Sequence, residues 1–245
     1  MACCHRTSSP RAGGVRTLAN RILTHLSNRE RAALLADAEH VVLPAGQTLA
    51  RPGDAITHLY FPDSGVIAWV SEMASGHHVA VASVGAEGVV GISRILAIPR
   101  HPYHVVALLE SAGHRLHIDA MLRAFDGFEG FMAAVLAHIG RHLIEVANLV
   151  ACSRVHSHRQ RLARWILMMT DKAGEQSIPI THDVLAQVVG GPRHAVTVAL
   201  NELRAKGAIA HLRGRVEILN RSVLIAHACE CYTQHLNVIR SAGSQ

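Results

Sequence analysis

Apolar and polar positions follow different patterns along the chain, and each pattern predicts a different structure. Residues 23–37 have the spacing of a short amphipathic helix, with Ser27 as its N-cap and Glu30 completing a capping box. From Glu39 to His117, β-rich runs alternate with turn residues at roughly ten-residue spacing, which indicates an antiparallel barrel or sandwich. The runs are EHVVL, QTLA, THLYF, VIAWV, HHVAVASV, YHVVALLE and HRLHI, and the breaks include PAG, RPGD, PDSG, ASG and SAG.

A heptad repeat follows a short helix expected over residues 119–125. From about Glu129 to Ala151, apolar residues recur at alternating spacings of four and three, which is typical of a helix that pairs with another helix. These seam residues are Met132, Leu136, Ile139, Leu143, Val146 and Val150. Phe131, Val135 and Leu149 form a second apolar flank. We therefore expect a homodimer helix, and burial of the seam inside one chain is the alternative.

The last third of the chain predicts helices and a small hairpin. Ser157 and Gln160 form a second capping box, at the start of a helix that places Arg164 toward its polar face. The segment THDVLAQVV is a helix capped by Thr181, and Gly207 ends the helix that comes next. AIAHLRGRVEIL predicts strand, turn and strand, and SVLIAHACECYTQHL predicts one closing helix.

The junction VVGGPRHAV carries the functional prediction. A helix that stops at two glycines and restarts with Pro192 and Arg193 is typical of a helix-turn-helix, whose second helix points its N-terminal turn into a DNA major groove. Arg193 can bond guanine there in bidentate fashion, and His194 and Thr197 share its exposed face. Thr181 and Arg213 are further candidates for DNA contact. A sharp turn between two core helices is the alternative.

Charge supports the DNA-binding prediction. The net charge is +6, but residues 1–150 carry 12 arginines and 12 acidic residues, whereas the last 95 residues carry ten arginines and two lysines against six acidic residues. A basic module beside a neutral one favours a polyanionic partner. Ordinary surface charge is the alternative.

Composition excludes several other classes. With 49% hydrophobic and 17% charged residues, a folded protein is expected, and no secretory signal or membrane-length apolar run is evident, so we expect a cytoplasmic protein without a membrane partner. The first acidic residue is Glu30, so residues 1–20 resemble a transit peptide in composition, although a disordered leader or a misplaced start is favoured. The chain lacks HExxH, GxSxG, P-loop and GxGxxG motifs, and no enzyme is expected.

Cysteine and histidine leave the question of a cofactor open. The five cysteines show no CxxC spacing, which fits a reduced compartment, and they are Cys3, Cys4, Cys152, Cys229 and Cys231. Cys229 and Cys231 fall in the predicted closing helix, where an i,i+2 pair points apart, so buried inert thiols are favoured over a redox pair. His138 and His142 have a metal-chelating spacing, but we favour polar surface histidines over a haem or metal sensor. No metal site is predicted, and the sequence requires no cofactor.

The sequence resembles the Crp/Fnr family of bacterial transcription regulators over about residues 20–235. The resemblance lies in LPAGQTLARPGDAITHLYFPDSGVIAWV and VGAEGVVGI, which look like a cyclic-nucleotide-binding-type β-roll, and in LAQVVGGPRHAVTVALNELRAKGAI, which looks like its winged helix domain. It implies that Arg193 is the principal base-reading residue, that His194 and Val198 depart from the family pattern, and that the long helix forms a dimer on a near-palindromic operator. RNA polymerase is a candidate further partner.

The family's cyclic-nucleotide binders place a glutamate and an arginine at the cyclic phosphate. This chain has Gly91-Ile92-Ser93 and the arginine-free strand YHVVALLESAG at the corresponding places. Because phosphate needs charge-assisted donors, cAMP is not the expected effector, and the effector is left unknown.

The resulting fold class is α+β, with an antiparallel β-roll, a long dimerisation helix and a C-terminal winged helix-turn-helix. The expected divisions are a leader over 1–20, the sensor roll over 21–127, the dimerisation helix and hinge over 128–156, and the DNA-binding domain over 157–245. A haem- or metal-binding module whose winged domain contacts protein is the alternative function.

Overall fold

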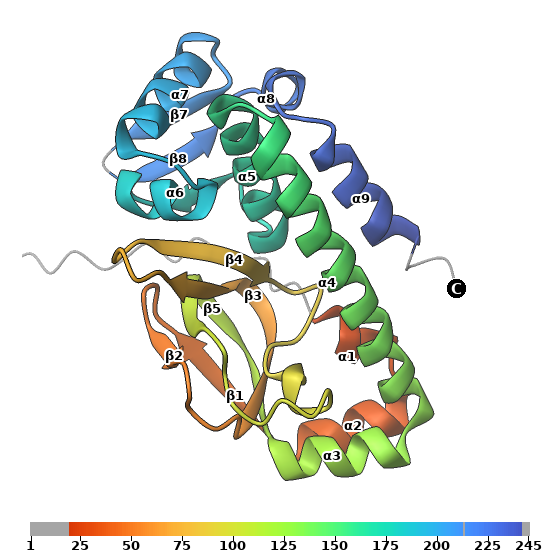
Figure 1. The fold of residues 1–245 in the computed structure, drawn as a ribbon. Helices are drawn as coiled ribbons and strands as arrows, with labels where there is room; N and C mark the ends of the chain where they lie inside the picture. Colours follow the sequence, from red (N-terminus) through yellow and green to blue (C-terminus); the bar gives the residue numbers. More distant parts are fainter. Residues whose placement is uncertain (1–19, 213, 242–245) are drawn as a thin grey trace, which may run out of the picture.

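The computed structural model describes residues 20–212 and 214–241 of the chain. Residues 1–19 and Arg213 lie outside the described residues, so all of the predicted leader except Asn20, and one predicted DNA contact, are not described. Figure 1 shows an antiparallel sheet, a long helix that runs past it, and a smaller domain of helices with a short sheet.

The N-terminal part of the chain forms a sheet flanked by helices. Its elements are α1 (Arg21–His25), α2 (Asn28–Ala36), β1 (Ala38–Leu43), β2 (Thr48–Ala50), β3 (His58–Glu72), β4 (His78–Val84), the 3-10 helix η1 (Ile92–Arg94), β5 (His104–His117) and α3 (Ile118–Gly127). The strands pair in the order β1-β5-β3-β4, with β2 also on β5, and every pairing is antiparallel. The predicted antiparallel roll is confirmed.

Two of the predicted strand breaks are wrong. PDSG and SAG lie inside the long strands β3 and β5, where Pro62 pairs with Gly113 and the register shifts on the way to Ser64. A Cβ at Gly113 would lie 2.2 Å from the carbonyl oxygen of Phe61, so the glycine allows two backbones to approach instead of forming a turn. The hairpin at Ser75 and Gly76 does connect β3 and β4, as predicted.

The predicted helix 23–37 is two helices. Ser27 interrupts it, and its hydroxyl accepts the Glu30 N–H while the Glu30 carboxylate accepts the Ser27 N–H, which is the predicted capping box. Local side-chain chemistry therefore gave the helix start correctly, but not the short helix before it.

The C-terminal part begins with the long helix. Its elements are α4 (Glu129–Val155), α5 (His158–Ala173), β6 (Ser177–Pro179), α6 (His182–Val189), α7 (Arg193–Ala205), β7 (Ile209–Leu212), β8 (Arg215–Ile218), α8 (Arg221–His227) and α9 (Cys231–Ser241). The predicted hairpin is β7–β8, and β6, which was not predicted, pairs with β8. The prediction of one closing helix is wrong, because residues 228–230 are not helical and separate α8 from α9.

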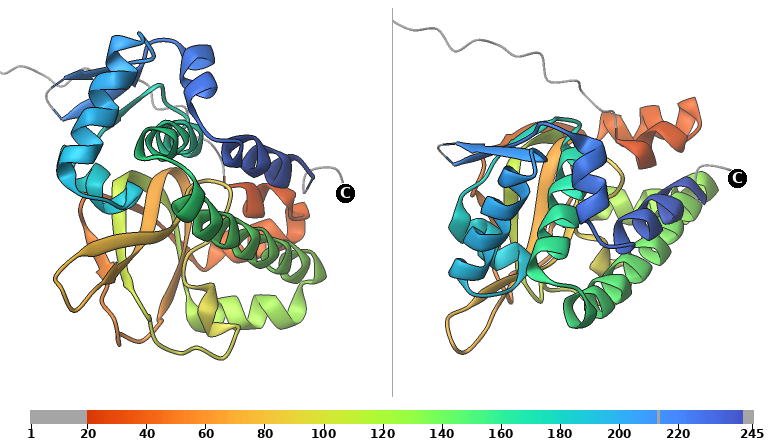
Figure 2. Two further views of the ribbon diagram at one scale, coloured as in Figure 1. Left: turned by 45° about the horizontal axis from the view of Figure 1, so that its top comes forward. Right: turned by 90° about the horizontal axis from the view of Figure 1, so that it is seen from above.

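The small domain rests on the sheet. α5 packs on β3 and α6 on β4, and Val66 and Leu109 of the sheet belong to the same core as Leu162, Ile166 and the other buried residues of the small domain. Figure 2 shows α9 returning along α4, and contacts between these two helices agree with that view.

Candidate nucleic-acid interface and buried polar clusters

The glycine junction forms the turn of a helix-turn-helix. The Thr181 hydroxyl accepts the Val184 N–H and so caps α6, which ends at Gly190 with a positive φ of 70°. Arg161 of α5 donates to the Gly190 carbonyl oxygen at 2.9 Å and fixes the turn to the domain. Pro192 is the N-cap of α7 and makes no side-chain cap bond, so the first helical residue is Arg193.

The N-terminal turn of α7 is open to solvent. Val196, Leu200 and Leu203 are buried on its inner face, as predicted. The Arg193 side chain is 66% exposed and forms an ion pair with Asp183 at 3.1 Å, a partner that the sequence patterns did not identify. His194 is also exposed.

Thr197 is less available than predicted. It is half-buried, its hydroxyl donates to the Arg193 carbonyl oxygen at 3.1 Å, and the hydroxyl oxygen lies 3.3 Å from Nδ1 of His182. The neighbouring Val198 is 54% exposed and lies one helical turn after His194. The exposed face of α7 therefore holds Arg193, His194 and Val198, with Thr197 at its edge.

The seam of α4 faces outward. Within the described chain Leu143 is 70% exposed, Val150 54% and Leu136 48%, and Met132 is exposed as well, while Ile139 and Val146 are half-buried. In the second flank, Phe131 and Val135 are fully buried against α1 and the sheet core, and Leu149 is half-buried.

By length and composition α4 could cross a membrane, because an 18-residue window has a mean hydropathy of 1.3 and only 17% of that window is buried. The helix nonetheless contains no uninterrupted apolar run of membrane-spanning length, because His138, Arg141 and Glu145 interrupt it. One of its charged residues, Glu145, faces the body of the protein, where it pairs with Lys172 and His235. An apolar outer stripe on a helix whose polar residues bind its own chain is the pattern of a helix that packs against another helix.

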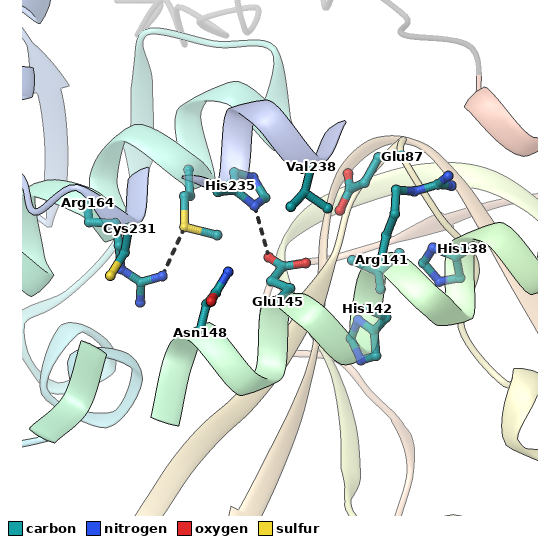
Figure 3. Close-up of a pocket in the computed structure, with 12 residues that line it drawn as sticks. Glu87, His138, Arg141, His142, Glu145, Asn148, Arg164, Cys231, His235 and Val238 are labelled. Carbon is teal, nitrogen blue, oxygen red and sulfur yellow. Dashed lines mark hydrogen bonds and ion pairs between the residues drawn. The ribbon is translucent and has the colours of Figure 1, made fainter. Parts of the chain in front are cut away.

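Figure 3 shows a small pocket where α4, α5, α9 and the loop after β4 meet. Beside it, the Lys172 ammonium lies 3.0 Å from both Glu87 and Glu145 and donates to the Ser83 carbonyl oxygen at 2.7 Å. Burial opposes the charge of Glu87, but the Lys172 ammonium and the Gly85 N–H outweigh it and lower the pKa of Glu87 to about 2. This ion triad joins the sheet, the long helix and the small domain.

His138 and His142 are not surface residues. His138 is 3% exposed, and burial lowers its pKa to about 4, while the ring of His142 lies 5.0 Å from that of Trp69. The expectation that they replace polar surface residues is wrong, because His138 packs on the loop after β4, where its Nε2 accepts the Val89 N–H, and His142 packs on β3. Neither histidine is part of the ligand cluster described next.

Three cysteines and one histidine converge at the end of α4. Cys152, Cys229 and Cys231 are 0%, 3% and 6% exposed, and His156 lies beside them. Cys229 precedes α9 and Cys231 begins it, so the premise that both point apart on one helix is wrong. The i,i+4 pair Cys152 and His156 was the signal in the sequence that could have indicated this cluster.

The comparisons with known proteins match both parts of the fold. A cyclic nucleotide-binding domain model matches residues 40–126, and a Crp-like helix-turn-helix domain model matches residues 160–226. The chain belongs to the Crp/Fnr family. The two Crp/Fnr modules lie on either side of α4 and together cover most of the sheet and the helix-turn-helix.

Similar proteins include other regulators of this family. The global nitrogen regulator of Synechococcus elongatus is 22% identical in a 184-residue alignment that covers 71% of this chain and 83% of that protein. A CRP-family transcriptional regulator of Thermus thermophilus superposes with a TM-score of 0.66 at 22% identity, over 77% of this chain and 96% of that one. FixK2 of Bradyrhizobium japonicum superposes with a TM-score of 0.67 at 14% identity, over 78% and 98%. At these identities the superpositions show a shared Crp/Fnr fold.

Proposed function

We propose that this Crp/Fnr-type transcription regulator acts in the cytoplasm as a homodimer that binds a near-palindromic DNA operator through α7. The observation that carries the proposal is the exposed Arg193 at the open N-terminus of α7, directly after the glycine turn. Free N–H groups and the positive end of the helix dipole favour phosphate there, and a guanidinium can bond guanine in the major groove.

The ion pair with Asp183 orients the Arg193 side chain but is weak enough to be broken when DNA binds. The two side chains are 66% and 63% exposed, and an exposed ion pair contributes only about 0–1 kcal/mol. Arg193 can therefore exchange the carboxylate for a base edge at small cost. His194 and Val198 are adjacent on the exposed face, so base preference next to the Arg193 contact should depend on them.

The proposed dimer rests on the exposed seam of α4. A second copy of the chain would cover exposed apolar side chains such as Leu143 and Val150. Removing that apolar surface from water stabilises a dimer by about 25 cal/mol per Å². A two-fold axis along the paired α4 helices would present two α7 helices to successive major grooves.

The sensor domain is proposed to respond to something other than a cyclic nucleotide. A cyclic phosphate needs charged or N–H donors, whereas β5 places Val105, Ala107 and Leu109 on its buried face, with 3% exposure or less. These residues do not fit a phosphate, and the effector is left unassigned.

A salt series of gel shifts tests the proposal. Binding of the full chain to fragments of its own promoter region should weaken steeply between about 50 and 200 mM salt, since each phosphate contact releases counterions. Arg193→Ala should weaken specific binding by about 5- to 100-fold and relax preference at one position of each half-site. Arg123→Ala is the matched control, because Arg123 is 68% exposed and pairs with Asp37 at 3.2 Å, but lies on α3.

Salt-independent binding, or equal losses in the two variants, would contradict the DNA-binding role assigned to α7. A pull-down of protein alone by the winged domain, with no promoter binding at any salt concentration, would favour the alternative that this domain contacts protein.

A further inference from the structure

The cluster at the end of α4 joins two segments that lie on either side of the winged domain in sequence. Cys152 and His156 belong to the last turn of α4 and its C-cap, and Cys229 and Cys231 lie in the link to α9 and in its first turn. The chain therefore enters the winged domain, residues 157–228, and leaves it at the same place in the fold.

The spacing of the side chains matches a single tetrahedral ion. One ligand atom from each of the four residues lies within 4.8 Å of all the others. The sulfurs of Cys152 and Cys229 are 3.6 Å apart, and the Cys231 sulfur is 3.7 Å from Nδ1 of His156. A tetrahedral zinc ion with bonds of about 2.3 Å to sulfur and about 2.0 Å to nitrogen has edges of about 3.5–3.8 Å between its ligands.

His156 is oriented as a metal ligand would be. Its Nε2 lies 3.1 Å from the carboxylate of Glu230, the residue between the two cysteines. A hydrogen bond from Nε2–H to that carboxylate leaves Nδ1 as the unprotonated nitrogen, and Nδ1 is the atom that faces Cys231. Carboxylates placed behind a histidine in this way fix its tautomer in metal sites.

A buried cation lies next to the sulfurs. Arg164 is 6% exposed, its Nη1 donates to the sulfur of Met168 at 3.3 Å, and its Nε has no partner among the described residues. Figure 3 shows Arg164 beside Cys231. No described carboxylate forms an ion pair with Arg164, whereas three thiolates, a divalent ion and a neutral imidazole carry a net charge of −1 that this guanidinium would balance. The predicted position of Arg164 on the polar face is wrong, because its side chain is buried beside Cys231.

We propose that Cys152, His156, Cys229 and Cys231 form a Cys3His site for one thiophilic divalent ion, with zinc as the ion that the ligand set fits best. Each thiol releases its proton to solvent as the ion binds, and nothing is oxidised or reduced. The bound ion fastens the start of α9 to the end of α4, across the link where the winged domain begins. The site stands independently of the proposed DNA contacts.

Metal analysis of the full chain tests this proposal. Protein purified under reducing conditions, with any affinity tag removed, should contain about one zinc per chain and bind one Co²⁺ in its place. Thiolate-to-cobalt charge-transfer bands and tetrahedral d–d bands should then appear. Cys229→Ser should remove both the zinc and the bands. The double substitution Cys3→Ser and Cys4→Ser is the matched control and should remove neither.

A milder variant covers the case in which Cys229→Ser fails to fold. Glu230→Gln, at a residue that is 68% exposed, should leave the fold intact and weaken zinc affinity by about 10- to 100-fold in competition with a chelator. Arg193→Ala should bind zinc as the natural chain does, which separates this proposal from the DNA-binding one. A disulfide between Cys152 and Cys229 in the reduced preparation, an iron–sulfur absorption spectrum, or cobalt bands that persist in Cys229→Ser would each overturn the site.

Discussion

Substituting Lys172 with methionine should strongly destabilise the attachment of the winged domain to the sheet. The Lys172 side chain is 2% exposed, and its ammonium lies 3.0 Å from both the Glu87 and the Glu145 carboxylates. Methionine fills most of the volume but leaves two carboxylates in a buried site without a cation. Breaking a buried ion pair by removing one partner costs about 3–5 kcal/mol.

The pKa of Glu87 gives a second route to the same magnitude. It is lowered from 4.5 to about 2, and because one pKa unit corresponds to about 1.4 kcal/mol, the charged form of Glu87 is stabilised in the fold by about 3 kcal/mol. Since the folded pKa is the lower one, this contribution is complete above about pH 4.5 and is lost as the pH falls toward 2.

Thermal and urea unfolding of the full chain measure the effect. Lys172→Met should lower the melting temperature by roughly 6–20 °C at pH 7. Lys206→Met is the matched control, because Lys206 is the other lysine of the chain and is exposed. Adding Glu87→Gln and Glu145→Gln to Lys172→Met should recover much of the loss. A loss below about 1 kcal/mol, the value of a surface pair, would refute the assignment of this triad as a buried electrostatic joint.

Three further predictions follow from other parts of the structure. Leu143→Glu should shift the chain from dimer to monomer in analytical ultracentrifugation, while Val42→Glu, at a residue 61% exposed on the sheet, should not. A dimer that survives Leu143→Glu would rule out the α4 seam as the interface. Gly113→Ala should cost about 1–3 kcal/mol because its Cβ would meet the Phe61 carbonyl oxygen, whereas Gly127→Ala, with open space around it, should be nearly neutral, and equal unfolding midpoints would contradict this. His138 has a folded pKa of about 4, below its ordinary value, so the free energy of unfolding should decrease as the pH falls from 6.5 toward 4. His138→Gln should make the free energy of unfolding less dependent on pH in that window, and an unchanged pH profile would count against a buried neutral imidazole.

The features that the sequence predicted correctly depend on residues close together in the chain. The capping boxes at Ser27 and Ser157 are three-residue patterns, and both are present. The helix-turn-helix was predicted because Gly190 and Gly191 lie between two apolar-periodic segments. In each case the physical cause, a hydrogen bond or a backbone angle, is contained within one or two turns of chain.

The features that it missed depend on distant segments. PDSG and SAG look like turns locally, but pairing between β3 and β5 holds them extended. Lys172, Glu87 and Glu145 have no pattern in common and meet only because three segments fold together. The break between α8 and α9 contains Ala228, Cys229 and Glu230, with no glycine or proline to indicate it, so the convergence of the cysteines was hidden.

The ion triad also sets the energy scale for any movement of the winged domain. A regulator changes state when a ligand binds one arrangement better than another, and moving a two-state equilibrium from 1:99 to 99:1 requires about 5.5 kcal/mol. Any arrangement in which α5 leaves the sheet must separate Lys172 from Glu87, at a cost comparable to most of that amount. Contacts made near Glu145 and His235, where α4 and α9 meet the pocket, act on the same charges. A ligand that neutralises Glu145 or displaces Lys172 would therefore bind the two arrangements with the difference in free energy that a switch needs. A ligand bound on the far face of the sheet would influence these charges only through the packed core.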